Sequence, residues 1–213
     1  MQKTTIQKTM ILGLLGTLLC TASAQAQTTP TADDTATSKP ITIKLGAFLP
    51  SGSGTKNALG NTWFAVGGEY AFAKPGTSVM PIAFIDYTGK SKTVTVDNGV
   101  GGSADINSNA SSFGIGGGIR AYGNAGSSVT PFYGAGVGVY FNHYKANVND
   151  ATLGNLGDFS KNKTSIGFKL NVGAEFQKMY FVEADYFNAG KVNVVETANV
   201  EFSGINLLVG ARF

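Results

Sequence analysis

Period-two alternation of apolar with small or polar residues is the feature that most constrains what this chain can fold into. The clearest case is segment 165–176, SIGFKLNVGAEF, in which every second residue from Ile166 onward is apolar. Successive side chains of a β-strand point to opposite faces, so this segment has one apolar face and one face of Ser, Gly, Lys, Asn and Glu. Eight such segments follow one another between Ile41 and Phe213 and predict an all-β fold.

The eight segments are short, and their connections alternate in length. The segments are 41–48, 63–72, 79–87, 113–122, 132–142, 165–176, 180–187 and 204–213. The connections 73–78, 123–131 and 177–179 are short, whereas the other links run about a dozen residues or more. Short turns on one side and long loops on the other are typical of transmembrane β-barrels. With both termini on the side of the short turns, the number of strands must be even.

The first residues, 1–26, have the layout of a secretory signal peptide. Lys3 and Lys8 form a basic start, residues 10–20 form a short apolar run, and 24–26 (AQA) is a small-residue cleavage site. The apolar run is shorter than the roughly 20 residues that a membrane-spanning helix needs. Cys20 could instead mark a lipidation site, but the residue before it is Leu rather than a small residue.

The remainder divides into a leader and one domain. Residues 27–40 are rich in Thr, Ala, Asp and Pro without periodicity, and we expect a flexible periplasmic leader. Residues 41–213 would form the barrel domain. Residues 1–26 hold two of the 16 basic and none of the 13 acidic residues, so the mature chain is nearly neutral. This balance favours neither nucleic acid nor an anionic surface as a partner. No cysteine follows residue 20, so no disulfide is expected.

Alternation alone does not say whether the apolar face fills a soluble barrel, as in lipocalins, or meets lipid. The polar faces are rich in glycine and carry only about one or two charges per strand, which would make a poor soluble exterior. Aromatic residues such as Phe64, Tyr70 and Phe141 gather near segment ends, where they would form girdles at the two membrane interfaces. We therefore expect the apolar face to lie outside, against lipid.

The chain ends on an apolar-faced segment, 204–213, whose last residue is Phe213. Together with glycine-rich segments such as 133–140 (YGAGVGVY), this ending resembles the small bacterial outer-membrane β-barrels of the OmpA transmembrane-domain, OmpX and OmpW kind. The resemblance implies an eight-stranded antiparallel up-and-down transmembrane β-barrel in the cell outer membrane, surrounded by outer-membrane lipids. It also implies that the barrel-assembly machinery recognises the C-terminal strand, with Phe213 as the assembly signal. Closure requires segment 204–213 to pair with segment 41–48, because lipid cannot satisfy an open edge.

With lipid outside, the charges of the strands point inward and nearly cancel. They are Lys44, Glu69, Arg120, Lys169, Glu175, Glu183, Asp185 and Arg212, with Asp86 if segment 79–87 keeps its register. An eight-stranded barrel is only wide enough for its side chains, and an unpaired charge inside would be strongly penalised. We expect an ion-paired network that plugs the lumen, with Arg212 as a counter-ion of Glu69 or Glu183. A proton or ion path is the alternative interpretation of the same residues.

No catalytic, cofactor or metal site is predicted. His143 is the only histidine, and the Ser two positions on that a barrel deacylase would carry is absent. One histidine and no mature cysteine argue against zinc. Residues 52–56 (GSGTK) lack the spacing of a phosphate-binding loop and are expected to be a flexible outer loop. Four polar residues of the link between the fifth and sixth segments lack EF-hand spacing and are interpreted as loop tips. They are Asn147, Asn149, Asp150 and Asp158.

The longest loop, 88–112, begins with Lys90, Lys92 and an alternating TVTV run. It is expected to continue the flanking strands as a hairpin above the membrane, with an edge that can pair with a partner strand. The predicted function is non-enzymatic: an integral outer-membrane protein acting in envelope structure or surface interaction through its extracellular loops. The alternative is a narrow porin-like conduit for small or hydrophobic solutes. Its trough would be lined by Phe48, Phe132, Tyr140, Phe181 and Leu208.

Overall fold

A computed structural model places most of the chain after residue 38. It describes residues 39–72, 79–97, 102–123, 129–150, 153–177, 179–195 and 198–213. The predicted signal peptide, 1–26, lies outside these residues, as does the leader 27–40 except for its last two positions. Within the described residues, no helix is long and apolar enough to cross a membrane.

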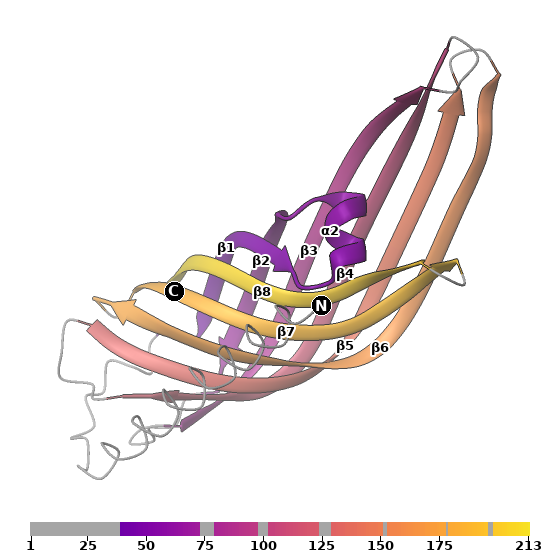
Figure 1. Cartoon of the computed structure of the whole chain (residues 1–213). Helices are drawn as coiled ribbons and strands as arrows, with labels where there is room; N and C mark the ends of the chain where they lie inside the picture. Colours follow the sequence, from indigo (N-terminus) through magenta and orange to yellow (C-terminus); the bar gives the residue numbers. More distant parts are fainter. Residues whose placement is uncertain are drawn as a thin grey trace, which may run out of the picture.

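In the described part of the chain, eight antiparallel strands form one closed barrel in which every strand pairs with its neighbours in sequence (Figure 1). The elements are β1 (Ile41–Pro50), α2 (Ser53–Leu59), β2 (Trp63–Ala71), β3 (Val79–Asp97), β4 (Ser103–Tyr122), β5 (Val129–Asp150), β6 (Gly154–Phe176), β7 (Tyr180–Val195) and β8 (Ala198–Arg212). The strands β1 and β8 pair from Thr42 opposite Arg212 to Pro50 opposite Gly204. The eight-stranded antiparallel fold and its closure by the first and last strands are confirmed.

The apolar side chains of the alternating pattern lie on the outside of the barrel. Ile43, Ile166 and Val209 are 52%, 85% and 53% exposed, and similar residues occur on every strand. The intervening residues point inward and are mostly buried. An apolar belt around the whole barrel is the surface of a transmembrane barrel, because a soluble barrel would turn these residues to its core. The lipocalin-like alternative is therefore wrong.

Inward-facing glycines make room for aromatic rings inside the barrel. The ring of Phe84 lies across Gly116, Gly136 and Gly138, at which a Cβ atom would lie 2.5, 2.9 and 3.2 Å from ring atoms. Because glycine has no side chain, the inward-facing glycines leave space that a few large aromatic side chains fill. The even spacing of glycine in β4 and β5 is a consequence of packing.

The end of the barrel that carries Ile41 and Phe213 is called the terminal end here, and the opposite end the hairpin end. At the hairpin end, α2 connects β1 to β2. Thr55 and Leu59 lie on one face of this helix and are 1% and 0% exposed. The Thr55 hydroxyl accepts a hydrogen bond from the backbone N–H of Glu201, at 2.7 Å. The expectation of a flexible loop at 52–56 is wrong, because contacts with β8 fix this segment as a helix.

The strands β3 to β6 run well past the predicted boundaries and project beyond the rest of the barrel (Figure 1). β3 and β4 stay paired to Asp97 opposite Ser103, so the hairpin predicted within 88–112 is confirmed. β5 and β6 stay paired to Asp150 opposite Gly154, with one register shift near Val148. Reading this second region as loop tips was wrong, since its strands carry polar residues on one face and short or apolar ones on the other.

Replacing Gly116 with Val tests the packing role of the inward glycines. The added atoms would meet the Val137 carbonyl and the Phe84 ring, so we expect the free energy of unfolding to fall by about 2 kcal/mol, as for overpacked cores. The adjacent Gly117 faces outward, and a Cβ there would lie 3.5 Å from its nearest neighbour, so Gly117→Val is the matched control. Thermal unfolding of the purified barrels gives the comparison. Equal stability of the two variants would contradict this account.

Candidate functional site

The centre of the barrel holds a ring of two cations and two carboxylates from four different strands. Lys44 Nζ lies 2.7 Å from Glu69 Oε1 and 2.5 Å from Glu183 Oε1. Arg120 Nη2 lies 2.7 Å from Glu69 Oε2 and 2.5 Å from Glu183 Oε2. All four side chains are at most 2% exposed. Each cation therefore bridges both carboxylates, and the ring ties β1, β2, β4 and β7 together across the interior.

Three more charged residues extend this ring towards the hairpin end. Lys169 Nζ lies 3.1 Å from Asp86 Oδ2 and 3.3 Å from Glu69 Oε1. The Lys169 ammonium also sits 3.9 Å from the centroid of the Phe84 ring. Asp185 Oδ2 lies 3.6 Å from Lys44 Nζ. Asp86 keeps its register opposite Gly67 and points inward. We call these seven residues the central network.

The central network has one more carboxylate than cations. Its members are Lys44, Arg120 and Lys169 against Glu69, Asp86, Glu183 and Asp185. Asn171, which sequence reasoning did not single out, donates a hydrogen bond to Glu183 Oε2 at 3.3 Å. Its inward position in segment 165–176 was the signal that could have identified it.

The remaining two predicted charges form a separate pair at the terminal end. Arg212 Nη2 lies 3.2 Å from Glu175 Oε2 and donates a hydrogen bond to the Tyr122 hydroxyl. Assigning Arg212 to Glu69 or Glu183 was wrong. Glu183 lies opposite Leu208, four residues before Arg212, and at about 3.3 Å per residue this separation keeps the two charges apart.

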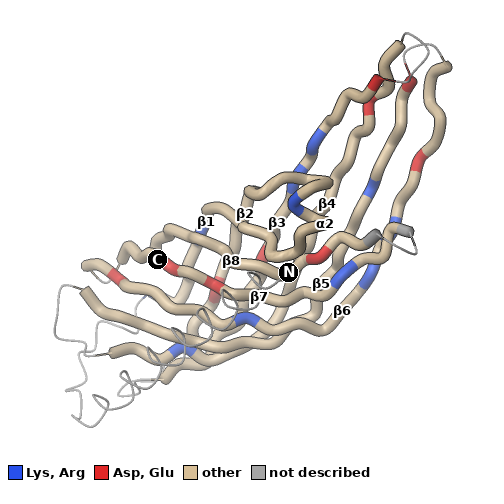
Figure 2. The backbone as a smooth tube through the Cα atoms, in the orientation of Figure 1, with Lys and Arg blue, Asp and Glu red and all other residues tan. Residues whose placement is uncertain are grey.

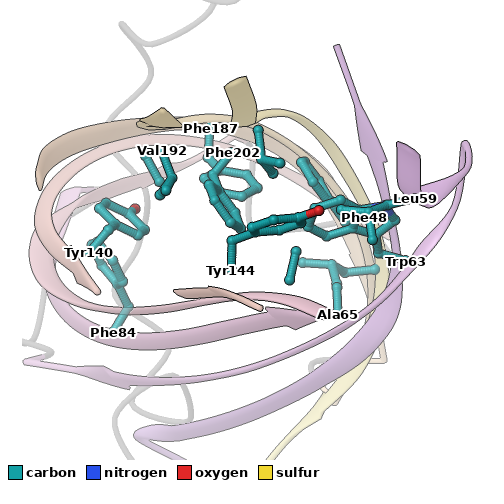
Figure 3. Packing of buried hydrophobic residues seen from close by; sticks show 14 residues of the cluster. Phe48, Leu59, Trp63, Ala65, Phe84, Tyr140, Tyr144, Phe187, Val192 and Phe202 are labelled. Atoms are coloured by element: carbon teal, nitrogen blue, oxygen red, sulfur yellow. The ribbon is translucent and has the colours of Figure 1, made fainter. Parts of the chain in front are cut away.

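Aromatic side chains lie on both sides of the central network. On the terminal side, the Arg120 guanidinium sits 4.5 Å from the centroid of the Phe132 ring, which packs against Phe181 with centroids 6.2 Å apart. At the hairpin end, a larger set forms what we call the mouth cluster (Figure 3). It comprises Phe48, Leu59, Trp63, Ala65, Phe84, Ala110, Tyr140, Tyr144, Phe187, Ala189, Val192, Val200, Phe202 and Leu208.

The five residues of the predicted apolar trough divide between these two layers. Phe132 and Phe181 belong to the terminal side, whereas Phe48, Tyr140 and Leu208 belong to the mouth cluster. On β7, Glu183 and Asp185 come between Phe181 and Phe187. On β5, Gly136 lies midway between Phe132 and Tyr140, and it pairs with Lys169 of β6. Charged residues thus interrupt the path that an apolar solute would follow. Several mouth-cluster residues, including Trp63, Phe187 and Phe202, were not named as lumen residues from sequence. Phe202 precedes the predicted start of the last strand.

The polar residues of the protruding strands bond to one another. His143 Nδ1 lies 2.5 Å from Asn162 Oδ1 on the neighbouring strand. Asn147 donates a hydrogen bond to Asp158, and Asn149 donates one to Asn147. Asp150 accepts a bond from the backbone of Leu153 at 2.9 Å. Among the described residues, no group of three or more His, Cys, Asp or Glu could hold a metal ion.

Two comparisons with known proteins found nothing: no protein-family model and no curated protein matches the chain. Solved structures do match. Ail, the attachment invasion locus protein of Yersinia pestis, in complex with the heparin analogue sucrose octasulfate, is 14% identical with a TM-score of 0.47, covering 82% of this chain and 96% of that chain. Neisserial surface protein A (NspA) is 17% identical with a TM-score of 0.45, covering 81% of this chain and 94% of that chain. These values describe a likeness in architecture.

Removing one member of the central ring should lower the stability of the folded barrel. Lys44→Met would leave Glu183 and Glu69 with one fewer buried partner, and we expect the free energy of unfolding to fall by about 3 kcal/mol. Glu175→Gln at the terminal end keeps a polar partner for Arg212 and serves as the milder control. Trp63, the only tryptophan, is 2% exposed and reports urea unfolding by its fluorescence. A Lys44→Met protein as stable as the parent would show that the ring contributes nothing.

In strand number, order and direction, the described strands form an eight-stranded antiparallel up-and-down barrel.

Proposed function

We propose that this protein is an integral outer-membrane barrel that acts at the cell surface through the strands projecting from its hairpin end, above a plugged lumen. The projecting residues 90–97, 103–110, 144–150 and 154–161 are called the protruding sheet. The observation that carries the proposal is that these four strands remain paired with one another beyond the apolar belt, whose last large residues on β3 and β4 are Tyr87 and Phe113. Such a sheet is a built surface held outside the membrane.

The terminal end fits the periplasmic side of this arrangement. Phe213 exchanges two backbone hydrogen bonds with Ile41, at 2.7 and 3.1 Å, while its side chain remains 60% exposed. An aromatic side chain at this height can anchor the barrel at the membrane interface. The same exposed ending supports a role for the last strand as the signal read by the barrel-assembly machinery.

The two faces of the protruding sheet differ in charge. Strand alternation carries the inward face of the barrel upward, and on this face of the protruding sheet lie Lys90, Lys92 and Lys161, with Asp150 as the acid. Lys163 lies on the same face of β6, two residues below the sheet. Figure 2 marks the Lys, Arg, Asp and Glu positions along these strands. The outward face carries a different set. It holds Asp97, Asp105 and Asp158 with Lys145.

The lysines flank apolar strands. Lys90, Ala110, Tyr144 and Lys161 lie in one row across the four strands. Lys161 Nζ also sits 5.7 Å from the centroid of the Phe159 ring. A basic face with an apolar centre suits a ligand that carries several negative charges, because such a ligand can contact lysines on both edge strands at once.

Intact cells that display the protein are expected to bind fluorescent heparin, used as a polyanion probe, and binding should weaken in high salt. Changing Lys90, Lys92, Lys161 and Lys163 to Ser should reduce binding at least tenfold. Lys145→Ser, on the outward face, is the matched control.

Display is checked with a Ser160→Cys variant, since a membrane-impermeant maleimide can reach this single cysteine only if the hairpin end is outside. Unlabelled intact cells would contradict the topology, and heparin binding that survives the four substitutions would contradict the assignment of the basic face.

The ion pairs and the two aromatic layers support a closed lumen. The central ring spans the interior, and Lys169 and Asp86 fill the space beside it. A solute would have to separate buried ion pairs to pass, and breaking a buried pair costs several kcal/mol. We therefore favour a structural role for the lumen over the porin-like conduit, and a non-enzymatic role for the protein.

A further inference from the structure

A small cavity beside the central network is lined by buried oxygens that no ion pair uses. Thr88, Ser112, Tyr140 and Asn206 line it and are 4%, 1%, 1% and 7% exposed. Within the described residues, the side-chain oxygen of each makes no hydrogen bond. Asp86 lines the same cavity. Its volume is about 10 Å³, roughly the space for one water-sized particle.

The cavity is assembled from strands far apart in sequence. Thr88 of β3 lies directly opposite Ser112 of β4, and Asn206 comes from β8. Phe187 and Leu208 supply the apolar part of its lining. Four unpaired oxygens meeting in one apolar enclosure would be costly without an occupant, because each buried polar group that lacks a partner costs about 1–3 kcal/mol.

The chemistry of the lining favours a cation. Two aliphatic hydroxyls, a phenol, an amide oxygen and a carboxylate are hard oxygen donors, the ligand type that alkali and alkaline-earth cations prefer. Asp86 uses Oδ2 for its 3.1 Å contact with Lys169. Its carboxylate can therefore face both the ammonium and the cavity.

The charge balance points the same way. The central network sets three cations against four carboxylates, and Asp185 lies opposite Asn206 on the neighbouring strand. A net negative charge in the barrel interior is unfavourable, so an added positive charge would stabilise the central network. One monovalent cation restores neutrality, whereas a divalent cation would overshoot.

We propose that this cavity binds a single dehydrated monovalent cation of the Na⁺ class, held by the Asp86 carboxylate and the oxygens of Thr88, Ser112, Tyr140 and Asn206. The bound cation completes the central network and satisfies the oxygens of the cavity. The site belongs to the barrel interior, so it does not depend on the surface role proposed above.

The test measures thermal unfolding of the purified, folded barrel in NaCl and in choline chloride at equal ionic strength. Choline is too large for the cavity, so Na⁺ alone should raise the unfolding midpoint, by about 3 °C at saturation. The rise should saturate with Na⁺ concentration. Because this comparison uses the unmodified protein, it does not depend on a variant folding.

Variants locate the site. Ser112→Ala removes one ligand and Asp86→Asn removes the excess negative charge, and both should abolish the Na⁺ response. Ser111→Ala, at the neighbouring position on the opposite face of β4, should keep it. Equal midpoints of the unmodified protein in NaCl and choline chloride would overturn the proposal and indicate that water fills the cavity and a proton neutralises the fourth carboxylate. A Na⁺ response that persists in both Ser112→Ala and Asp86→Asn would also overturn it.

Discussion

Closure of the sheet on itself is the constraint on which the rest of this structure depends. Inside a bilayer every backbone N–H and C=O must find its partner within the protein, and the pairing of β1 with β8 meets this requirement. A ring of only eight strands leaves an interior no wider than its own side chains. Charged side chains that point inward therefore lie close to one another. The central ring of Lys44, Glu69, Arg120 and Glu183 is a consequence of closure as much as of sequence.

The same narrow interior explains the layering along the barrel. Large rings such as Phe84 fit only where glycines face them, and these rings pack against the buried cations of the central network. Above the apolar belt, water can bond to the backbone, so strands need not end at one height. β3 and β6 become the open edges of the protruding sheet, because β2 pairs with β3 only to Gly89 and β7 pairs with β6 only from Phe168. The region freed from the lipid constraint is also the one available for partners.

Strand number, closure and the inward direction of the eight charges follow from alternation, because a period of two fixes the face of every residue once one face meets lipid. Which inward charges pair with each other does not follow from alternation. The stagger between strands decides it, and it places Arg212 beside Glu175. The helix α2 was missed because seven residues have little intrinsic stability as a helix, and the contacts of Thr55 and Leu59 that fix it are tertiary. The β5–β6 extension was missed because its outward face carries polar residues such as Lys145, Asn147 and Asp158 in place of the large apolar residues of the membrane-spanning part.

The central claim is that side chains close the lumen, and single-channel recording in planar bilayers tests it most directly. The purified barrel, inserted at low density, should show no steady conductance, because the central ring and the aromatic layers of Phe132 and the mouth cluster lie across the only path through the barrel described here. Glu183→Gln, which weakens the ring, should give at most brief openings. Reproducible, ion-selective openings of the unmodified protein would contradict the account.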